Sequence, residues 1–229
     1  RTAAEEAFQL LIDHGLDMKV LTITAKDKIC FQEETICTSE NCPFADGFYD
    51  RINGAIIDIL EQEKMINRSV IEQYARKHMV CPFEFSIELA YAVDAVICDY
   101  NYIFDPRVSL KRLLDDQKKK TAILVDEAHN LVDRAREMYS ATIHKSNFLQ
   151  LKREIKNSRL ATAAKAINDH LLNAKKSEEY LRKDLDGKLV ELLETFITEA
   201  EVELVRIDHE LLLDTYFAAQ SFVKIASLY

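Results

Sequence analysis

Tryptophan is absent from this chain of 229 residues, and only three prolines and four glycines are present. No apolar run reaches the roughly 18 residues of a transmembrane helix, which excludes a membrane span. No charged segment followed by an apolar stretch stands at the start, so no secretory signal is expected and the protein is predicted to be soluble and cytoplasmic. Because the first residue is Arg1 rather than methionine, we also expect a piece of a longer chain.

An excess of positive charge is also missing. The chain has 30 basic and 39 acidic residues, a net charge of -9, which argues against a surface devoted entirely to nucleic acid. A local basic groove is still compatible with this balance. Basic residues predominate over 151–176 and acidic residues over 177–214. This pattern is typical either of two solvated helix faces that attract one another or of a DNA contact.

Disulfide bonds are not expected. The five cysteines stand at positions 30, 37, 42, 81 and 98, and an odd number without a secretory signal argues against a disulfide framework. Reduced thiols, metal ligands and buried small side chains are the remaining roles. Cys98 lies inside an apolar segment and is expected to pack there.

The most informative segment is Thr121–Asn130, which reads TAILVDEAHN. Its apolar half is short enough for a buried central strand, and Asp126, Glu127 and His129 follow where open α/β sheets bind their ligands. An aspartate there can hold Mg²⁺, and a glutamate can activate the water that attacks a γ-phosphate. The segment therefore predicts a Walker B element. The alternative is a strand end whose carboxylates cap a helix over 130–139.

Apolar spacing predicts the surrounding elements. Helices are expected over 3–14, 48–66, 69–78 and 83–91, the first and third opened by the capping boxes Thr2–Glu5 and Ser69–Glu72. Strands are expected over 19–24 and 94–100, and a helix over 106–119 leads to the strand at 121–125 in a parallel βαβ unit. That unit would bring Tyr100 and Asp126 to one edge of the sheet. Apolar repeats over 147–172 and 189–213 predict a helical hairpin or small bundle.

Between residues 25 and 43 the periodicity disappears, so a core cannot order this loop. Cys30, Cys37 and Cys42 lie in it, and Cys81 stands at a helix start that favours a thiolate. Only Cys37 and Cys42 have the close spacing usual in zinc sites, whereas irregularly spaced thiolates suit an iron–sulfur cluster. A cluster, a zinc site and inert buried thiols are the three alternatives.

The order of these motifs resembles the XPD and DinG family of superfamily 2 DNA helicases, most closely its bacterial DinG-like branch. The resemblance rests on TAKDKIC, VCPFE, CDYNYIFDPRV and AILVDEAHN, and it covers roughly residues 1–140. It implies an α/β, helix-rich fold in which residues 1–24 and 93–140 form part of the first motor domain, with a P-loop-type parallel sheet. Residues 25–92 would be an inserted helical four-cysteine FeS domain, and 141–229 an all-helical arch-like domain.

The resemblance also implies roles for individual residues. Asp126 and Glu127 match the Mg²⁺-binding and water-activating pair of an ATP site, and His129 matches the residue that links nucleotide state to DNA binding. The ligands of a [4Fe-4S] cluster would be Cys30, Cys37, Cys42 and Cys81. Residues expected near single-stranded or forked DNA are Arg1, Thr2, Lys26, Tyr100 and Tyr102, with core packing expected for at least one of the tyrosines.

Two parts of such an enzyme are missing. The sequence has no GxxxxGK[ST] phosphate loop, and nothing resembles the later motifs of a second motor domain. The resemblance thus predicts part of an ATP-dependent 5′–3′ DNA helicase of DNA repair or replication, with the chain inactive by itself. One alternative is a metal- or cluster-stabilised nucleic-acid-binding module without ATPase activity. Another is an iron–sulfur oxidoreductase, although no flavin or nicotinamide fingerprint is visible.

Overall fold

The computed structural model describes residues 2–107, 121–156, 158–174 and 181–229. They divide into two compact units. The first contains the chain up to Ile103 together with the segment that ends at Val125, and the second contains Phe104–Arg107 and Asp126–Tyr229. No helix within the described ranges is long and apolar enough to cross a membrane.

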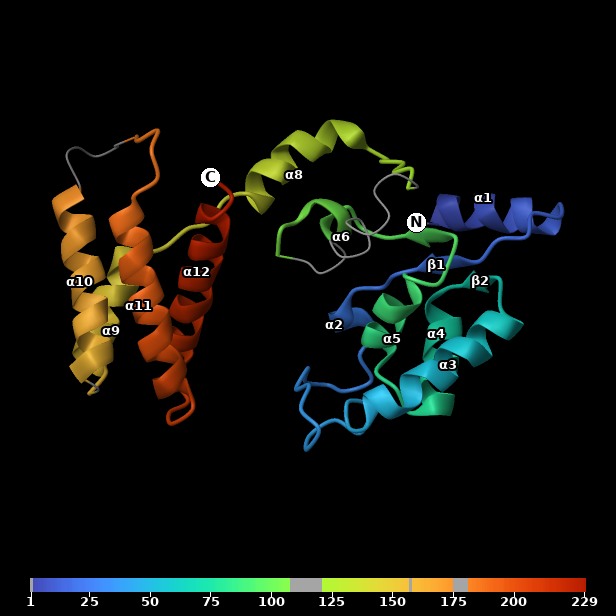
Figure 1. Cartoon of the computed structure of the whole chain (residues 1–229), viewed down its shortest axis with the longest axis horizontal. Helices are drawn as coiled ribbons and strands as arrows, with labels where there is room; N and C mark the ends of the chain where they lie inside the picture. The colour runs from blue at the N-terminus through green and yellow to red at the C-terminus, as the bar shows by residue number, and fades with distance from the viewer. Residues whose placement is uncertain (1, 108–120, 157, 175–180) are drawn as a thin grey trace. The chain divides into compact units, whose positions relative to one another are not determined.

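A three-stranded parallel sheet forms the centre of the first unit (Figure 1). Its strands are β1 (Val20–Thr22), β2 (Met65–Ile66) and β3 (Ala95–Ile97), in the order β2-β1-β3. Val20 pairs with Met65 on one side and with Ala95 on the other, so β1 has neighbours at both edges and is buried throughout. This sheet among many helices confirms the predicted helix-rich α/β class.

The described residues up to Phe104 also form six helices. They are α1 (Thr2–Asp13), α2 (Lys26–Ile29), α3 (Phe48–Gln62), α4 (Arg68–His78), α5 (Pro82–Leu89) and α6 (Asn101–Phe104). Helix α5 contacts α2, α3, α4 and β1. It therefore joins the helices to the sheet, and its fully buried Phe85 lies in the same core as Leu21 of β1 and Ile59 of α3.

The local signal at the start of α4 differs from the predicted capping box. At α4 the cap is Asn67, whose side chain accepts a hydrogen bond from the Val70 N–H at 3.2 Å. Ser69 donates to Asn67 and Glu72 pairs with Arg68, so the predicted box at Ser69 and Glu72 is wrong. An asparagine can cap a helix as well as a serine can, and Asn67 stands two residues before Ser69.

Two further predictions about strands need correction. The helix expected over 48–66 ends at Gln62, because Met65–Ile66 pairs with β1 instead. The strand expected over 121–125 is not formed: its residues lie outside the sheet, and Leu124 is 94% exposed. The sheet has open edges at β2 and β3, and residues 121–125 pair with neither, so their backbone makes no ladder hydrogen bonds. The helix expected over 106–119 lies almost entirely outside the described residues.

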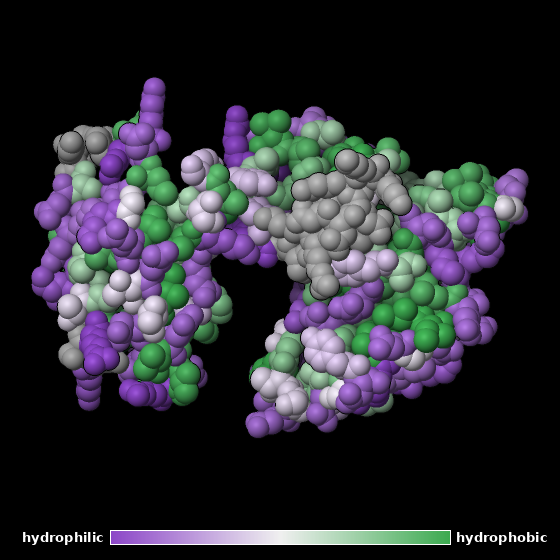
Figure 2. Space-filling view, in the orientation of Figure 1, coloured by the Kyte–Doolittle hydropathy of each residue, from purple (hydrophilic) through white to green (hydrophobic). Residues whose placement is uncertain are grey.

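The second unit is helical. A short 3₁₀ turn (Ala128–Asn130) leads into α8 (Leu131–Met138), followed by α9 (Lys145–Glu154), α10 (Ser158–Ala174), α11 (Gly187–Leu204) and α12 (Glu210–Ala226). Helices α9 to α12 pack against one another in chain order, and α12 also packs on α9 (Figure 1). Figure 2 shows mainly hydrophilic residues on the visible face of this bundle. The predicted small bundle is therefore present.

Aromatic packing organises the interior of this bundle. Phe148 of α9 and Phe196 of α11 are fully buried, with ring centroids 5.1 Å apart in an edge-to-face arrangement. At the start of α11, Asp186 accepts a hydrogen bond from the Leu189 N–H and contacts His170 of α10 at 3.0 Å. The cap therefore also ties α11 to its neighbour.

Candidate functional site

Cys81 occupies the cap position at the start of α5, directly before Pro82. Burial raises the pKa of the Cys81 thiol above its usual value, and hydrogen bonds from the backbone N–H groups of Phe83 and Glu84 oppose that rise. Two N–H groups aimed at one sulfur are the arrangement that stabilises a thiolate at a helix N-terminus. The thiol is thus placed to ligate a cation that offsets its burial.

Lys26 connects two of the cysteines. Burial lowers its pKa, but a hydrogen bond with Cys37 and the nearby Cys37, Glu84 and Cys81 side chains outweigh burial, so the pKa of Lys26 is raised. Its ammonium nitrogen lies 3.7 Å from a Glu84 carboxylate oxygen and 5.6 Å from the centre of the Phe83 ring. A single cation therefore faces Cys37 from the long loop and Cys81 from the start of α5.

The other two cysteines lie on segments joined by aromatic packing. Cys30 ends α2, which contacts α5, and the next residue, Phe31, has its ring 4.9 Å from that of Phe44. Phe44 follows the buried Cys42 by two residues, and the Arg76 guanidinium of α4 lies 3.8 Å from the Phe31 ring. A guanidinium over an aromatic face is attracted to it. The segments that follow Cys30 and Cys42 are therefore both held next to α4.

The donor chemistry fits an iron–sulfur cluster, although the thiols are not assembled into one site. All four cysteines are free thiols, which as thiolates are the usual ligands of such clusters. In the described part of the chain, no three histidine, cysteine or acidic side chains lie together as a metal site. Four thiolates repel one another, so a bound metal commonly supplies the attraction that completes such a site.

The DEAH residues lie on a solvent-facing turn. The Glu127 N–H donates to the Asp126 carboxylate at 2.9 Å, and His129 Nδ1 lies 3.3 Å from the Glu127 carboxylate. Glu127 has a left-handed backbone (φ 51°) and begins the 3₁₀ turn before α8. Asp126 and Glu127 do not cap α8, whose cap residue is Asn130. Both carboxylates remain accessible, but the strand that was expected to present them is absent.

The two tyrosines predicted near DNA have different surroundings. Tyr102 is 9% exposed and belongs to the core of the first unit, as expected for at least one of the pair. Tyr100 is only half-buried. The nearby turn is fixed by Asp105, which accepts hydrogen bonds from the Arg107 N–H and guanidinium at 2.8 and 2.9 Å. Thr2 is exposed at the start of α1, and Arg1 lies outside the described residues.

A family model named DEAD_2 matches residues 12–148, which is more than half of the chain. The chain belongs to the DEAD_2 family. The matched range includes the four cysteines, Lys26, both tyrosines and the DEAH residues. This membership confirms the family that the motifs indicated.

Curated relatives agree with membership of the DEAD_2 family. The Fanconi anemia group J protein homolog of Gallus gallus is 32% identical over 80 residues, covering 35% of this chain and 6% of the relative. The regulator of telomere elongation helicase 1 homolog of Anopheles gambiae is 30% identical, covering 48% and 10%. The general transcription and DNA repair factor IIH helicase subunit XPD of Dictyostelium discoideum is 29% identical, covering 67% and 18%.

This DEAD_2 chain spans only 6 to 18% of the length of those three relatives. The matches concern a limited part of long proteins, so the activity of a whole relative does not transfer directly. They also do not test the predicted bacterial DinG-like branch, which stays a prediction.

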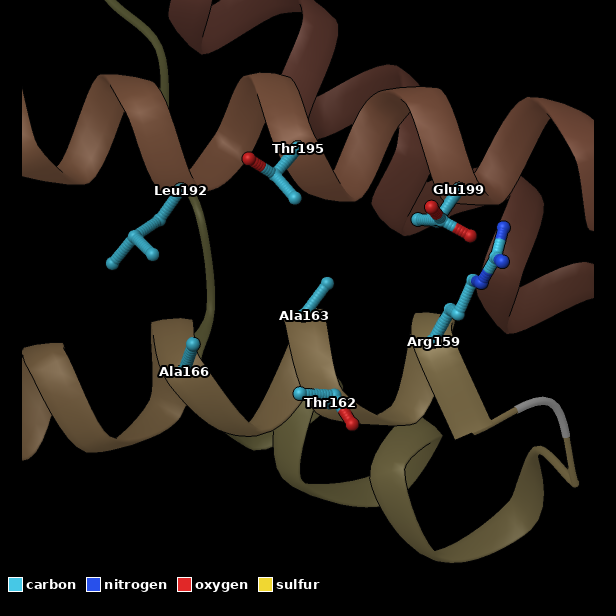
Figure 3. A pocket seen from close by; sticks show the side chains of 7 residues that line it. All are labelled: Arg159, Thr162, Ala163, Ala166, Leu192, Thr195 and Glu199. Atoms are coloured by element: carbon cyan, nitrogen blue, oxygen red, sulfur yellow. The ribbon is translucent and has the colours of Figure 1, made fainter.

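A surface pocket of about 380 Å³ lies between α10 and α11 (Figure 3). Figure 3 shows Arg159 and Glu199 at one end, with Ala163 facing Thr195 across the pocket. The lining residues are Arg159, Thr162, Ala163, Ala166, Leu192, Thr195 and Glu199. None of them was predicted as a site residue.

Sequence reasoning assigned no role to Arg51 of α3. This side chain nevertheless contacts the segment after Cys42, which precedes α3, and the segment before Cys81, which follows α4. Its guanidinium donates to the backbone oxygens of Pro43, Asp46 and Met79. Backbone carbonyls exist at every position, so no residue pattern identifies such acceptors. The only local signal was Gly47, directly before the helix that carries Arg51.

Proposed function

We propose that this chain is part of an ATP-dependent DNA helicase that moves 5′ to 3′ along single-stranded DNA and separates forked duplexes in DNA repair or replication. Membership of the DEAD_2 family carries the proposal, because the matched range contains both the cysteine segments and the DEAH residues. The names of two relatives, which describe helicases, support it.

Asp126, Glu127 and His129 supply the catalytic side chains of the proposed ATP site. Asp126 would hold Mg²⁺, and Glu127 would orient the attacking water and accept its proton. His129, 3.3 Å from Glu127, transmits the state of this carboxylate toward the DNA-binding segments. When bound, Mg²⁺ neutralises charge on the ATP phosphates. Because the phosphate loop and second motor domain are absent, the chain alone binds no ATP productively.

Cys30, Cys37, Cys42 and Cys81 hold a [4Fe-4S] cluster in this proposal. When bound, the cluster supplies an inorganic crosslink between segments that have little apolar core of their own. Lys26 stays beside Cys37 and Cys81 and presents a positive charge to a DNA backbone. Half-buried Tyr100 stacks on a base, while Arg1 and Thr2 contact the phosphates.

The complete protein tests the helicase proposal directly. We expect it to unwind forked duplexes that carry a 5′ single-stranded tail and to leave duplexes with only a 3′ tail intact, because translocation has one polarity. The measurement is release of a fluorescent strand in the presence of ATP and Mg²⁺. Unwinding from 3′ tails alone would contradict the proposed polarity, and ATP-independent DNA binding without hydrolysis would favour the binding-module alternative.

Metal content tests the cluster. Chain purified without oxygen is expected to be brown and to contain about four irons and four sulfides per molecule, since four thiolates complete one cubane cluster. Iron, sulfide and zinc assays of the same sample provide the measurement. A colourless protein with stoichiometric zinc would replace the cluster by a zinc site.

A further inference from the structure

We propose that Arg51 is a positioning residue that clamps the Cys42 segment to the Cys81 segment and thereby arranges these two thiols for the cluster, an inference that rests on the cluster assignment above. Arg51 lies in α3, between the loop that contains Cys42 and the helix α4 that precedes Cys81. It is not itself a ligand.

The contacts of Arg51 extend to both sides. Its Nε and Nη2 atoms donate to the Met79 carbonyl oxygen at 3.1 and 2.7 Å. Nη2 also donates to the Pro43 carbonyl at 3.4 Å and to that of Asp46. Met79 stands two residues before Cys81, and Pro43 directly follows Cys42. One planar guanidinium therefore binds backbone oxygens beside both cysteines, which a lysine could not do with the same fixed geometry.

The backbone around both acceptors is arranged for this contact. Met79 adopts the left-handed conformation, with φ 54°, at the end of α4. A non-glycine residue is strained there, so the surroundings must hold it, and two of the Arg51 hydrogen bonds end on its carbonyl oxygen. On the other side, the Cys42 carbonyl accepts hydrogen bonds from Ala45 and Asp46, which closes a turn that directs further carbonyls toward Arg51.

Gly47 provides an independent sign of the clamp. It has φ +58°, and a Cβ at this position would lie 2.7 Å from the nearest guanidinium nitrogen of Arg51. A side chain at position 47 would therefore push the guanidinium from its place as well as strain the turn. The absence of a side chain at position 47 leaves the space that Arg51 occupies.

Amide hydrogen exchange tests the clamp without any metal. In the metal-free 229-residue chain, Arg51→Ala is expected to speed exchange of the amides of residues 44–47 and 79–81 by about tenfold, the factor for losing one charge-assisted hydrogen bond. Arg68→Ala is the matched control, because Arg68 belongs to the same unit and pairs only with Glu72 in the described contacts. It should leave both segments unchanged. Unaltered exchange in Arg51→Ala would overturn the clamp.

A double-mutant cycle separates the contact from strain at Gly47. Gly47→Ala should speed exchange in the same segments, through both backbone strain and the clash with Arg51. When Arg51 is already alanine the clash is gone, so the effect of Gly47→Ala should be smaller. Equal effects in both backgrounds would show that Gly47 does not act through Arg51. Gly54→Ala, for which no atom lies within 4 Å of the new Cβ, is the glycine control.

Iron release provides the readout for ligand positioning. After anaerobic reconstitution, Arg51→Ala should lose iron to a chelator about tenfold faster than the wild type while its circular dichroism stays the same. Equal release rates would overturn the positioning role. If the wild type binds no iron at all, the cluster assignment fails, whereas the exchange experiment still decides whether Arg51 clamps the two segments.

Discussion

Replacing Phe85 by alanine is expected to destabilise the first unit strongly. Phe85 is 0% exposed and lies in α5, the helix that contacts the central strand β1 and three other helices. Removing a buried phenylalanine costs about 3–5 kcal/mol, because its transfer energy is lost and a cavity remains. Whole domains are stable by only about 5–15 kcal/mol, so this one change removes a large part of the total.

Urea unfolding monitored by circular dichroism measures this prediction. Because the chain has two compact units, two transitions are expected, and only the one that belongs to the first unit should shift. Phe217→Ala is the matched control: Phe217 of α12 is 57% exposed, so its loss should change stability by less than about 0.5 kcal/mol. Equal shifts in the two variants would contradict the assignment of Phe85 to the core.

Phe85→Ala should also lower the iron content of anaerobic protein. Phe85 stands four residues after Cys81, and its N–H donates to the Cys81 carbonyl at 2.9 Å. A loosened α5 no longer aims the Phe83 and Glu84 N–H groups at the sulfur. The iron content should therefore decrease in variants that lower the stability of the first unit, and it should not depend on the stability of the second unit.

Helix existence was predictable because apolar spacing is a local property of the sequence. Residues 3–14 and 69–78 were expected to be helical, and α1 and α4 occupy nearly these ranges. The break between α9 and α10 was not predictable in this way. Ile155 has extended backbone angles and is nevertheless buried, so it keeps its place in the apolar repeat while the helix ends. Apolar periodicity reports burial and does not determine the dihedral angles of each residue.

The second apolar repeat, over 189–213, shows a similar limit. Helix α11 ends at Leu204, and α12 begins after His209, whose ring accepts a hydrogen bond from the Leu212 N–H at 3.3 Å. Histidine is an uncommon cap, so the residue types that usually mark a helix start did not predict this boundary. Leucines on both sides of the break still pack into one core.

Non-local pairing explains the strand that was wrongly predicted. The apolar residues of 121–125 match a central strand by composition, but composition does not determine pairing, and this segment pairs with neither open edge of the sheet. The short β2 shows the converse, since Met65 and Ile66 belong to a predicted helix and became a strand because β1 lay beside them. The cysteine segments follow the same rule: their order was visible in the sequence, whereas the carbonyl contacts of Arg51 were not.

Glu127→Gln in the complete protein should reduce the rate of ATP hydrolysis by about 10²–10⁴-fold, the usual contribution of a general base. Glutamine has nearly the same shape and can still accept a hydrogen bond from His129, but it cannot take a proton from the attacking water. Substrate binding does not depend on that step, so ATP affinity should stay close to that of the wild type. The fall would therefore appear in kcat rather than in binding.

Steady-state hydrolysis with saturating single-stranded DNA, together with equilibrium binding of a fluorescent ATP analogue, separates these two quantities. Glu137→Gln is the matched control, because Glu137 is an exposed glutamate of α8 whose described partner is Arg134 at 3.0 Å. It should leave both quantities unchanged. Hydrolysis at the wild-type rate in Glu127→Gln would assign the water-activating role to another group. A parallel loss of ATP binding would instead mean that Glu127 supports the folded turn between Asp126 and His129, where its N–H donates to Asp126 and its carboxylate contacts His129.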